Sequence, residues 1–527
     1  MASILTVASL LILASGVAYT FSRYLWRKDV RPLPPGPKGI PFLGNVNDMP
    51  KPGVLECHHW LKHKDLYGPI SSVTAMGQTF IIINDPDIAF ELLRDRAAIH
   101  SSRPCPVFSG DMVGFAGATA MIPYNDTWKI HRKIITQVAS SNKSIAAFDR
   151  AQEIESAHFL LNVLDSPEKL FKHLQNEAGS VVLRITYGYI AAHGADPLVE
   201  VAAQTMLDFS VSTVPGMWMV DYLPLLRYVP GWLPGTGFKK TARQMAMRLK
   251  QCTDQPYEWV KQQMREKRHT TSFVSEFIEN TSTETEMEFI HKWAAMSLFL
   301  AGVDTTSSSL MIFFLAMMVY PEVQKKASEE IDHVIGKSRL PVAADRDKLP
   351  YIMAMVKETH RWHLVLPLGF PHSNIEQDIY RGYRIPKGSI LLPNNWHFTH
   401  DPEVYPDPMA FKPERHLDTP THKAEPDPRK FIYGYGRRIC PGRYVADNAL
   451  FITIAQSLAV FDITKPTENG KIVEPNVEFK PGTFSHPLPY RCSIKPKSKE
   501  HEDLIRAAEL EHPWEESDAT GLESVKW

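Results

Sequence analysis

Residues 431–442 have the sequence FIYGYGRRICPG and combine one cysteine with three glycines and two arginines. No second cysteine and no histidine stands close to Cys440, which argues against a zinc site. The glycines allow the backbone to approach a large flat group closely. Pro441 suits the first turn of a helix, which the apolar spacing predicts over about 443–459. The amino end of that helix would favour a thiolate, and Arg438 supplies a cation for an acidic edge of the bound group.

A thiolate on a glycine-lined loop, beside a helix terminus and an arginine, is what an axial haem ligand requires. The stretch resembles the cysteine loop of the cytochrome P-450 haem-thiolate monooxygenases, and Gly436, Arg438 and Gly442 match the family positions. The resemblance implies that Cys440 is the metal ligand of haem, iron protoporphyrin IX. Tyr433 departs from the family, which usually has phenylalanine there, and its hydroxyl needs a partner. A buried structural cysteine in a glycine-rich turn is the alternative.

Composition sets broad limits on the fold and on partners. The chain has 527 residues and a hydrophobic fraction of 44%, so it is long for one domain and can bury a large core. The formal net charge of −1 gives no indication of nucleic-acid binding. Five scattered cysteines, an odd number, argue against a disulfide framework and favour a reducing compartment.

The amino-terminal stretch 2–21 carries no charge and is long enough to cross about 30 Å of hydrocarbon. Basic residues follow this stretch and none precedes it, so the positive-inside rule places the remainder of the chain in the cytosol. We expect a membrane anchor at 1–26, with a cleaved signal peptide as the alternative. The proline-rich segment 27–45 indicates a stiff hinge, although taken alone it also suits an SH3-type ligand.

The longest helical pattern covers 288–320 and contains the sequence AGVDTT. Five residues share one of its faces at helical spacing: Leu298, Ala301, Gly302, Thr305 and Ser309. Ala301 and Gly302 leave a gap beside which Asp304 and Thr305 offer an acid and a hydroxyl that can relay protons. The motif matches the family's oxygen-activation motif, which implies that Asp304 and Thr305 are catalytic and that Ala301 and Gly302 contact the haem. A second membrane span is the alternative, and the central aspartate disfavours it.

Two further segments are candidates for binding the haem. Trp128 and Arg132 stand four residues apart on one helical face, and the resemblance assigns such a pair to the haem propionates. A solvated basic helix with one packed tryptophan is the alternative. The apolar run 364–371 is interrupted by prolines and is expected to line the pocket beside the haem, with His372 as a propionate partner.

An ExxR motif and a PER segment stand between these motifs in the family order. Glu358 and Arg361 lie three residues apart on a predicted helix and can form a charge-assisted pair. The resemblance implies a buried structural network of Glu358, Arg361 and Arg415 that braces the haem loop. His416 stands where the family often has phenylalanine, which leaves the local packing open.

The substrate pocket is predicted from two segments that face substrate in the family. Residues 109–119 are rich in glycine and are expected to form a mobile loop, and 482–486 correspond to a hairpin tip. The candidate pocket residues are Met112, Phe115, Leu298, Leu366, Leu368 and Phe484.

The predicted fold class is mainly α with small β-sheets, a cytochrome P-450 fold preceded by one N-terminal transmembrane helix. A β-hairpin is expected over 70–84, where two β-rich runs flank Gly77. The haem-thiolate catalytic domain is placed at 46–497. The polar tail 498–527 is expected to be loosely ordered, with a helical pattern over 500–511.

The resemblance implies a monooxygenase that inserts one oxygen atom from O2 into an apolar small molecule of terpenoid, polyketide or alkaloid type, like microsomal enzymes of fungal secondary metabolism. No nicotinamide or flavin fingerprint is apparent, so electrons from NADPH would arrive through the membrane-bound NADPH–cytochrome P-450 reductase, with cytochrome b5 as an optional donor. The implied location is the endoplasmic reticulum membrane, with one span and a cytosolic catalytic domain. The alternatives are a haem-thiolate isomerase or dehydratase that needs no O2, and a non-enzymatic haem-binding sensor; the acid–hydroxyl pair disfavours both.

Overall fold

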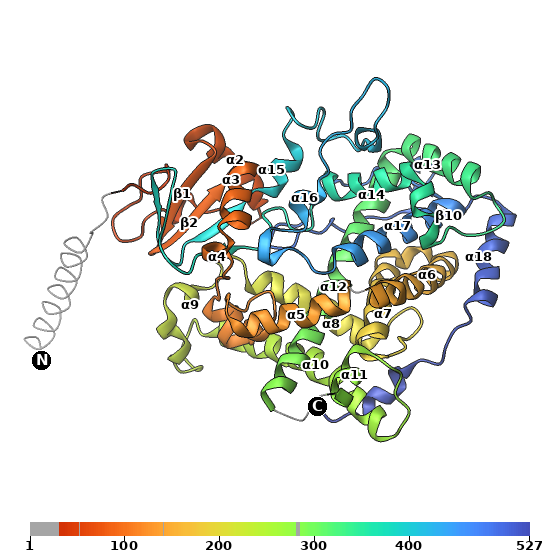
Figure 1. Cartoon of the computed structure of the whole chain (residues 1–527), viewed down its shortest axis with the longest axis horizontal. Coiled ribbons are helices and arrows are strands. Elements are labelled where there is room, and N and C mark those ends of the chain that lie inside the picture. Colours follow the sequence, from red (N-terminus) through yellow and green to blue (C-terminus); the bar gives the residue numbers. More distant parts are fainter. Residues whose placement is uncertain (1–30, 52, 141, 281–284) are drawn as a thin grey trace, which may run out of the picture.

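The computed structural model describes residues 31–51, 53–140, 142–280 and 285–527, so the predicted membrane anchor lies outside the described residues. Helices dominate the fold, and the largest sheet lies at one end of it (Figure 1). The α-helices are α2 Glu56–Tyr67, α3 Pro86–Phe90, α4 Ala97–His100, α5 Asp126–Ser140, α6 Asn142–Asp165, α7 Leu170–Tyr187, α8 Pro197–Ser212, α9 Met219–Tyr222, α10 Gly237–Arg265, α11 Phe273–Asn280, α12 Thr285–Val319, α13 Pro321–Val334, α14 Pro350–Trp362, α15 Asn395–His400, α16 Arg429–Ile432, α17 Arg443–Val460 and α18 Lys499–Glu511.

The strands form one four-stranded sheet and three two-stranded sheets in the described part of the chain. They are β1 Ile70–Ala75, β2 Gln78–Ile83, β3 His372–Ser373, β4 Asp378–Tyr380, β5 Tyr383–Ile385, β6 Ile390–Pro393, β7 Phe461–Thr464, β8 Thr467–Glu468, β9 Lys471–Ile472 and β10 Ser493–Pro496. The large sheet has the order β1-β2-β6-β3, with β2 and β6 parallel. The predicted hairpin is confirmed: β1 and β2 pair antiparallel across Met76 and Gly77, whose positive φ angles of 48° and 88° suit a two-residue turn.

The described part of the predicted hinge is docked on this sheet. The carbonyl oxygens of Pro34 and Pro35 accept hydrogen bonds from Ser72 Oγ at 2.6 Å and Ser72 N at 2.8 Å. The added Cβ of any side chain at Gly36 would lie 1.9 Å from the carbonyl oxygen of Ser72, so the close approach requires glycine here. The carbonyl oxygen of Pro32 also accepts a hydrogen bond from Arg384 N at 2.8 Å, so the segment is held from Pro32 onward.

Helix α12 passes through the middle of the molecule (Figure 1) and packs against α5, α7, α8, α14 and α17. Among the described residues it is the one helix that is long and apolar enough to cross a membrane, over Glu286–Val319. However, 72% of its most apolar 18-residue stretch is buried inside the fold. This burial explains its apolar composition without a membrane, since a helix that is hydrophobic all round also suits the core of a large protein. The long helix is confirmed, and its place is the core.

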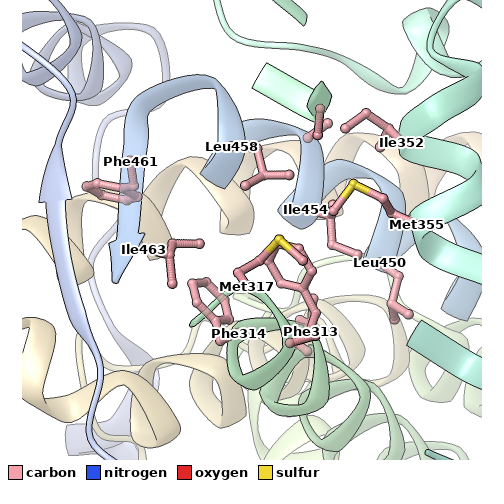
Figure 2. Packing of buried hydrophobic residues seen from close by; sticks show 14 of the residues in the cluster. Phe313, Phe314, Met317, Ile352, Met355, Leu450, Ile454, Leu458, Phe461 and Ile463 are labelled. Atoms are coloured by element: carbon pink, nitrogen blue, oxygen red, sulfur yellow. The ribbon is translucent and has the colours of Figure 1, made fainter. Parts of the chain in front are cut away.

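The largest core cluster fixes α12 relative to α17 (Figure 2). Figure 2 shows side chains from α12, α14, α17 and β7 meeting in one layer, labelled Phe313, Phe314, Met317, Ile352, Met355, Leu450, Ile454, Leu458, Phe461 and Ile463. Burying each such side chain stabilises the fold by about 1.5–3 kcal/mol relative to exposing it. The cluster therefore holds the end of the cysteine loop, where α17 begins, at a fixed distance from α12.

The prediction of a mobile loop at 109–119 is wrong. Residues Val107–Val113 form a single-turn π-helix and Phe115–Gly117 a 3₁₀-helix. Phe108 and Phe115 are buried, and the ring of Phe108 stacks on Trp218 at 3.6 Å between centroids. Glycine suggested mobility, but the apolar side chains between the glycines pack into the core and order the segment.

The prediction of a loosely ordered tail is also wrong, whereas the helical pattern at 500–511 is confirmed by α18. Helix α18 buries Ile505 and Ala508 against the fold and lies along α6. Farther on, Trp514 stacks on His158 at 3.8 Å, and Glu515 accepts a hydrogen bond from Arg184 at 2.8 Å. The few apolar residues of this polar segment stand at helical spacing on one face, which is enough to dock it.

Candidate active site

Cys440 lies at the end of a tight loop between α16 and α17. The N–H of Cys440 donates to the carbonyl oxygen of Tyr433 at 2.7 Å, which closes the loop. Gly436 has a φ of 51°, and a Cβ there would lie 2.6 Å from the carbonyl oxygen of Leu93. Glycine is therefore needed for the loop to pack against the helical turn Glu91–Asp95. Burial raises the pKa of the Cys440 thiol, whereas the N–H of Gly442 and the charges of Arg132 and Arg443 act to lower it.

The cysteine loop and α12 enclose a cavity of ≈ 420 Å³ between them. This volume lies within the range of small-molecule and cofactor sites, about 300–1,000 Å³. The predicted site residues in its wall are Phe115, Trp128, Arg132, Leu298, Ala301, Gly302, Thr305, Leu366, His372, Tyr433, Arg438, Cys440, Gly442 and Phe484. The structure thus brings together residues that span more than three hundred positions of the sequence.

Four of the residues predicted to be catalytic, to bind haem or to line the substrate pocket are absent from this wall: Met112, Asp304, Leu368 and Gly436. Met112 packs at the margin of the helical core cluster, and Leu368 packs against the cluster around Trp60 beneath the sheet. Gly436 contacts the backbone at Leu93 and Arg94 instead. Asp304 lies on the neighbouring face of α12, because successive helical residues point about 100° apart and Thr305 takes the cavity side.

Helix α12 presents a small-residue face to the cavity. The Thr305 hydroxyl donates to the carbonyl oxygen of Ala301 at 2.7 Å, which fixes its rotamer and leaves an oxygen lone pair toward the cavity. A Cβ at Gly302 would lie 2.5 Å from Cγ2 of Val182, so glycine here permits the close packing of α7 on α12. The expected gap at residues 301–302 is present, and its glycine also serves helix packing.

Three arginines in the cavity wall have no carboxylate partner among the residues that the structure describes. Arg132 donates to the carbonyl oxygen of Ile439 at 2.5 Å, and Arg438 donates to those of Ser101 and Ile122, each at 2.7 Å. Burial first, and then the charge of Arg132, lowers the pKa of Arg438 to about 9. The guanidinium of Arg438 also lies 4.3 Å from the ring centroid of Trp128.

Arg103 is the third of these arginines, and the sequence analysis missed it. It donates to the carbonyl oxygens of Phe370 and Pro371 at 2.6 and 2.7 Å, beside the buried imidazole of His372. Burial, and then the charge of Arg438, holds the pKa of Arg103 well below its ordinary value. Uncompensated buried cations are costly unless an anion accompanies them. The cavity wall therefore fits a ligand with an acidic edge on this side, as haem has in its two propionates.

An aromatic cluster forms a further part of the wall, and its Phe370 ring lies 4.9 Å from the guanidinium of Arg103. Phe209 is at its centre, 4.8 Å from Phe115, 5.8 Å from Phe370 and 5.9 Å from Phe484 between ring centroids. Phe115 and Phe484 were predicted as pocket residues, and Phe370 belongs to the run 364–371 that was expected to line the pocket. Phe209 was not assigned to the site from sequence, because an apolar position on a helix equally suits the core.

Comparison with known proteins matches these features to one family. A family model described as cytochrome P450 matches residues 34–493. The chain belongs to the cytochrome P450 family. Cytochrome P450 monooxygenase ppsD of Aspergillus oryzae is 42% identical over 99% of this chain and 100% of its own length. Cytochrome P450 monooxygenase claR of Ampulloclitocybe clavipes is 44% identical over 96% and 93%, and O-methylsterigmatocystin oxidoreductase of Aspergillus flavus is 40% identical over 96% and 95%.

Membership of the P450 family makes this chain a haem-dependent monooxygenase, an oxidoreductase that incorporates oxygen from O2. The mainly helical fold with small sheets agrees with the predicted class. The resemblance seen in the sequence is thereby confirmed at the level of the family.

The ExxR helix of this P450 carries a buried ion network. Glu358 accepts hydrogen bonds from Arg361 Nε at 2.8 Å and Arg361 Nη2 at 2.9 Å. It also accepts from Arg415 Nε at 3.2 Å and from His416 Nε2 at 2.9 Å. Burial acts to raise the pKa of Glu358, but the hydrogen bond from His416 and the charge of Arg361 lower it to about 2. His416, a departure from the family, thus supplies the network with a further donor.

Tyr433, the other departure, has a partner for its hydroxyl. Its Oη donates to Asp447 Oδ1 at 2.5 Å and lies 3.2 Å from Nε2 of His360. Arg429 Nη1 donates to the other oxygen of Asp447 at 2.7 Å. Burial acts to raise the pKa of Asp447, but its bonds to His360 and Arg429 hold it below the ordinary value. Because His360 lies on α14 beside Arg361, this cluster joins the ExxR helix to the cysteine loop.

Replacing Tyr433 with phenylalanine should destabilise the protein by about 1–3 kcal/mol, because the buried Oδ1 of Asp447 loses its nearest donor and keeps only the longer contact to His360 at 3.4 Å. The measurement is urea unfolding followed by haem absorbance and by circular dichroism. Tyr228→Phe is the control, since that side chain is 69% exposed and its change should leave the midpoint unaltered. Equal midpoints for the two variants would show that the Tyr433 hydroxyl contributes nothing.

Proposed function

We propose that this P450 holds haem in the ≈ 420 Å³ cavity with Cys440 as its axial thiolate and transfers one oxygen atom of O2 to an apolar small molecule. The observation that carries the proposal is that Cys440 and Thr305 share one cavity whose wall contains buried arginines without acidic partners among the described residues. When bound, a thiolate-ligated haem supplies oxygen activation. Arg132, Arg438 and Arg103 would bind its carboxylates, and Thr305 would hold a proton donor at the cavity wall. His372 would join the arginines through a protonated Nε2, because its Nδ1 already donates to the carbonyl oxygen of His100 at 2.8 Å.

The substrate is proposed to be an apolar metabolite of terpenoid, polyketide or alkaloid type from fungal secondary metabolism. The cluster of Phe115, Phe209, Phe370 and Phe484 supports this, because aromatic rings offer a large apolar surface with preferred stacking geometry. One relative is named O-methylsterigmatocystin oxidoreductase, which supports an organic small molecule as the substrate.

Electrons are proposed to come from NADPH through a separate reductase, with cytochrome b5 as a second donor, at the endoplasmic reticulum membrane. Exposed cations near the cysteine loop, Lys133, Lys430 and Arg437, suit docking of an acidic redox protein. Exposed apolar side chains favour contact with a membrane: Phe42 is 89%, Leu225 79% and Trp232 81% exposed. The uncharged stretch 2–21 supports a single anchor with the catalytic domain in the cytosol.

The test is oxygen incorporation from ¹⁸O2 with purified reductase and NADPH, comparing wild type with Thr305→Ala. The reaction RH + O2 + NADPH + H⁺ → ROH + H2O + NADP⁺ places one labelled atom in the product. The variant should keep its haem but give at least ~10-fold less product per NADPH, because a positioned proton donor contributes roughly 10²–10⁴-fold to a rate. The electrons should then leave as hydrogen peroxide.

Thr241→Ala is a matched control, since Thr241 on α10 makes the same kind of bond, to Gly237 at 3.4 Å, away from the cavity. Unlabelled product from the wild type would contradict the monooxygenase proposal. An unchanged yield per NADPH in Thr305→Ala would contradict the role of Thr305 alone.

A further inference from the structure

The carboxyl group of Asp304 faces away from the cavity, toward the segment 479–487. Its Oδ2 is buried and has no hydrogen-bond partner among the residues described. The group that Oδ2 faces is the imidazole of His486, whose Nε2 lies 3.7 Å away. Burial raises the pKa of Asp304 and the charge of His486 acts to lower it, so the two groups are coupled. A buried carboxyl oxygen without a hydrogen-bond partner requires an explanation, and the titratable side chain that this oxygen faces is His486.

The hydrogen bonds around His486 determine which ring nitrogen faces Asp304. Ser308 Oγ donates to the carbonyl oxygen of Asp304 at 2.7 Å and lies 2.6 Å from Nδ1 of His486. A serine hydroxyl has a single hydrogen, which the carbonyl oxygen of Asp304 already receives, so Nδ1 of His486 must be the donor to Ser308. In the neutral ring Nε2 then carries the lone pair. That nitrogen can accept a proton from solvent and pass it to Oδ2 of Asp304.

His486 is held in place and still reaches solvent. Its side chain is 16% exposed, compared with 9% for Asp304. The segment is closed by the hydrogen bond from Lys480 N to the carbonyl oxygen of His486 at 2.8 Å and by the bridge between Phe479 and Pro487. An imidazole group in contact with solvent can exchange protons with it, whereas a buried carboxyl group has no direct contact with solvent.

The other titratable groups near this pair lie on α2, α14 and α15. His363 binds Ser485 Oγ through Nε2 at 2.8 Å, and burial, followed by the charges of His400, His58 and His486, holds its pKa well below the ordinary value. Glu56 accepts a hydrogen bond from Gly482 N at 3.2 Å, and burial raises its pKa. Because His363 contacts Ser485 and Glu56 contacts Gly482, His486 is the member of this group that faces Asp304.

We propose that His486 is a positioning residue for oxygen transfer, which supplies Asp304 with protons from solvent by way of Nε2 and Oδ2. The inference rests on the proposed function, in which RH + O2 + 2e⁻ + 2H⁺ gives ROH + H2O and each turnover consumes two protons. A proton taken up at Nε2 moves to Oδ2 as the Nε2–H bond breaks, and solvent reprotonates His486. Asp304 stands next to Thr305 on α12, so the proton reaches the helix at the point where a hydroxyl faces the cavity.

The first measurement does not depend on turnover. Infrared spectra of the purified holoprotein give the carbonyl stretch of protonated Asp304, assigned by its loss in Asp304→Asn. In His486→Gln the titration of this band should move to higher pH, because the charge of His486 no longer acts to lower the pKa of Asp304. The matched control is His333→Gln on α13, an exposed residue that should leave the band unchanged. An unmoved band in His486→Gln would overturn the proposal.

The second measurement is the yield of product per NADPH with reductase. His486→Gln should lower the yield several-fold and raise the solvent isotope effect on product formation, with an unchanged haem spectrum. Ser308→Ala retains the imidazole of His486 and should lower the product yield per NADPH by a smaller factor. This variant replaces His486→Gln in the experiment if His486→Gln folds poorly. A yield equal to that of wild type would refute the role of His486. Absence of product in the wild type would refute the proposed function instead, and the infrared titration would still decide the Asp304–His486 link.

Discussion

Replacing Cys440 with serine is expected to abolish the red-shifted Soret band of the reduced carbonyl complex and all oxygen transfer. Cys440 is the only one of the five cysteines found in the cavity wall that the structure describes. A serine hydroxyl is a hard, weakly acidic donor and cannot replace the soft thiolate that gives the haem its character. The loop itself should persist, because its closing hydrogen bond to Tyr433 uses the backbone N–H of residue 440.

Cys492→Ser is the matched control for this experiment. Cys492 is half-buried like Cys440, but it packs against the main core cluster and lies outside the cavity wall. Its replacement should keep both the band and the activity, apart from a modest loss of stability. Absorbance of the reduced protein under carbon monoxide measures the outcome directly. A red-shifted band that survives in Cys440→Ser would show that another group ligates the iron.

The parts of the site that sequence predicted well are those in which local spacing determines the geometry. In α12, residues three and four apart share a face, so the position of Thr305 beside Ala301 follows from the helix alone. The cysteine loop is equally local, because Gly434 and Gly436 adopt positive φ angles of 78° and 51° and Pro441 precedes the helix. Both elements carry their geometry within about ten residues of sequence.

The parts that sequence missed depend on contacts between distant segments. Arg103 stands in an irregular stretch, and only folding brings it beside Arg438 and His372. Asp304 was expected beside the gap, but the rotation of the helix turns it toward His486, 182 positions later in the chain. No periodic pattern records such a pairing, since a lone histidine or arginine outside a helix has no spacing to indicate its neighbours.

The tail shows a different kind of error. Composition alone suggested disorder, because charged residues dominate 498–527. A small number of well-placed contacts was enough to order it, among them buried Ile505 and the stacking of Trp514 on His158. Average polarity is therefore a weaker guide than the spacing of the few apolar residues within a segment.

Replacing Glu358 with glutamine is expected to destabilise the protein by about 3–5 kcal/mol and to weaken haem retention. Glu358 and Arg361 are 0% exposed, so the change leaves the buried cation of Arg361 without a carboxylate, while Arg415, which is 3% exposed, keeps only Glu425 at 2.7 Å. Glutamine preserves the shape of the side chain, and the loss therefore reports the charge. The effect should also reach the cysteine loop, since α14 carries His360 beside Tyr433.

The same network makes stability depend on pH with a defined sign. The pKa of Glu358 is lowered from 4.5 to about 2 on folding, so its contribution is complete above about pH 4.5 and is lost as the pH falls toward 2. Urea unfolding midpoints of wild type and Glu358→Gln should converge across this interval. The control is Glu329→Gln on α13, whose pair with Lys325 at 3.9 Å is exposed and should contribute at most ~0.5 kcal/mol. Equal destabilisation in the two variants would show that the buried network does not support the fold.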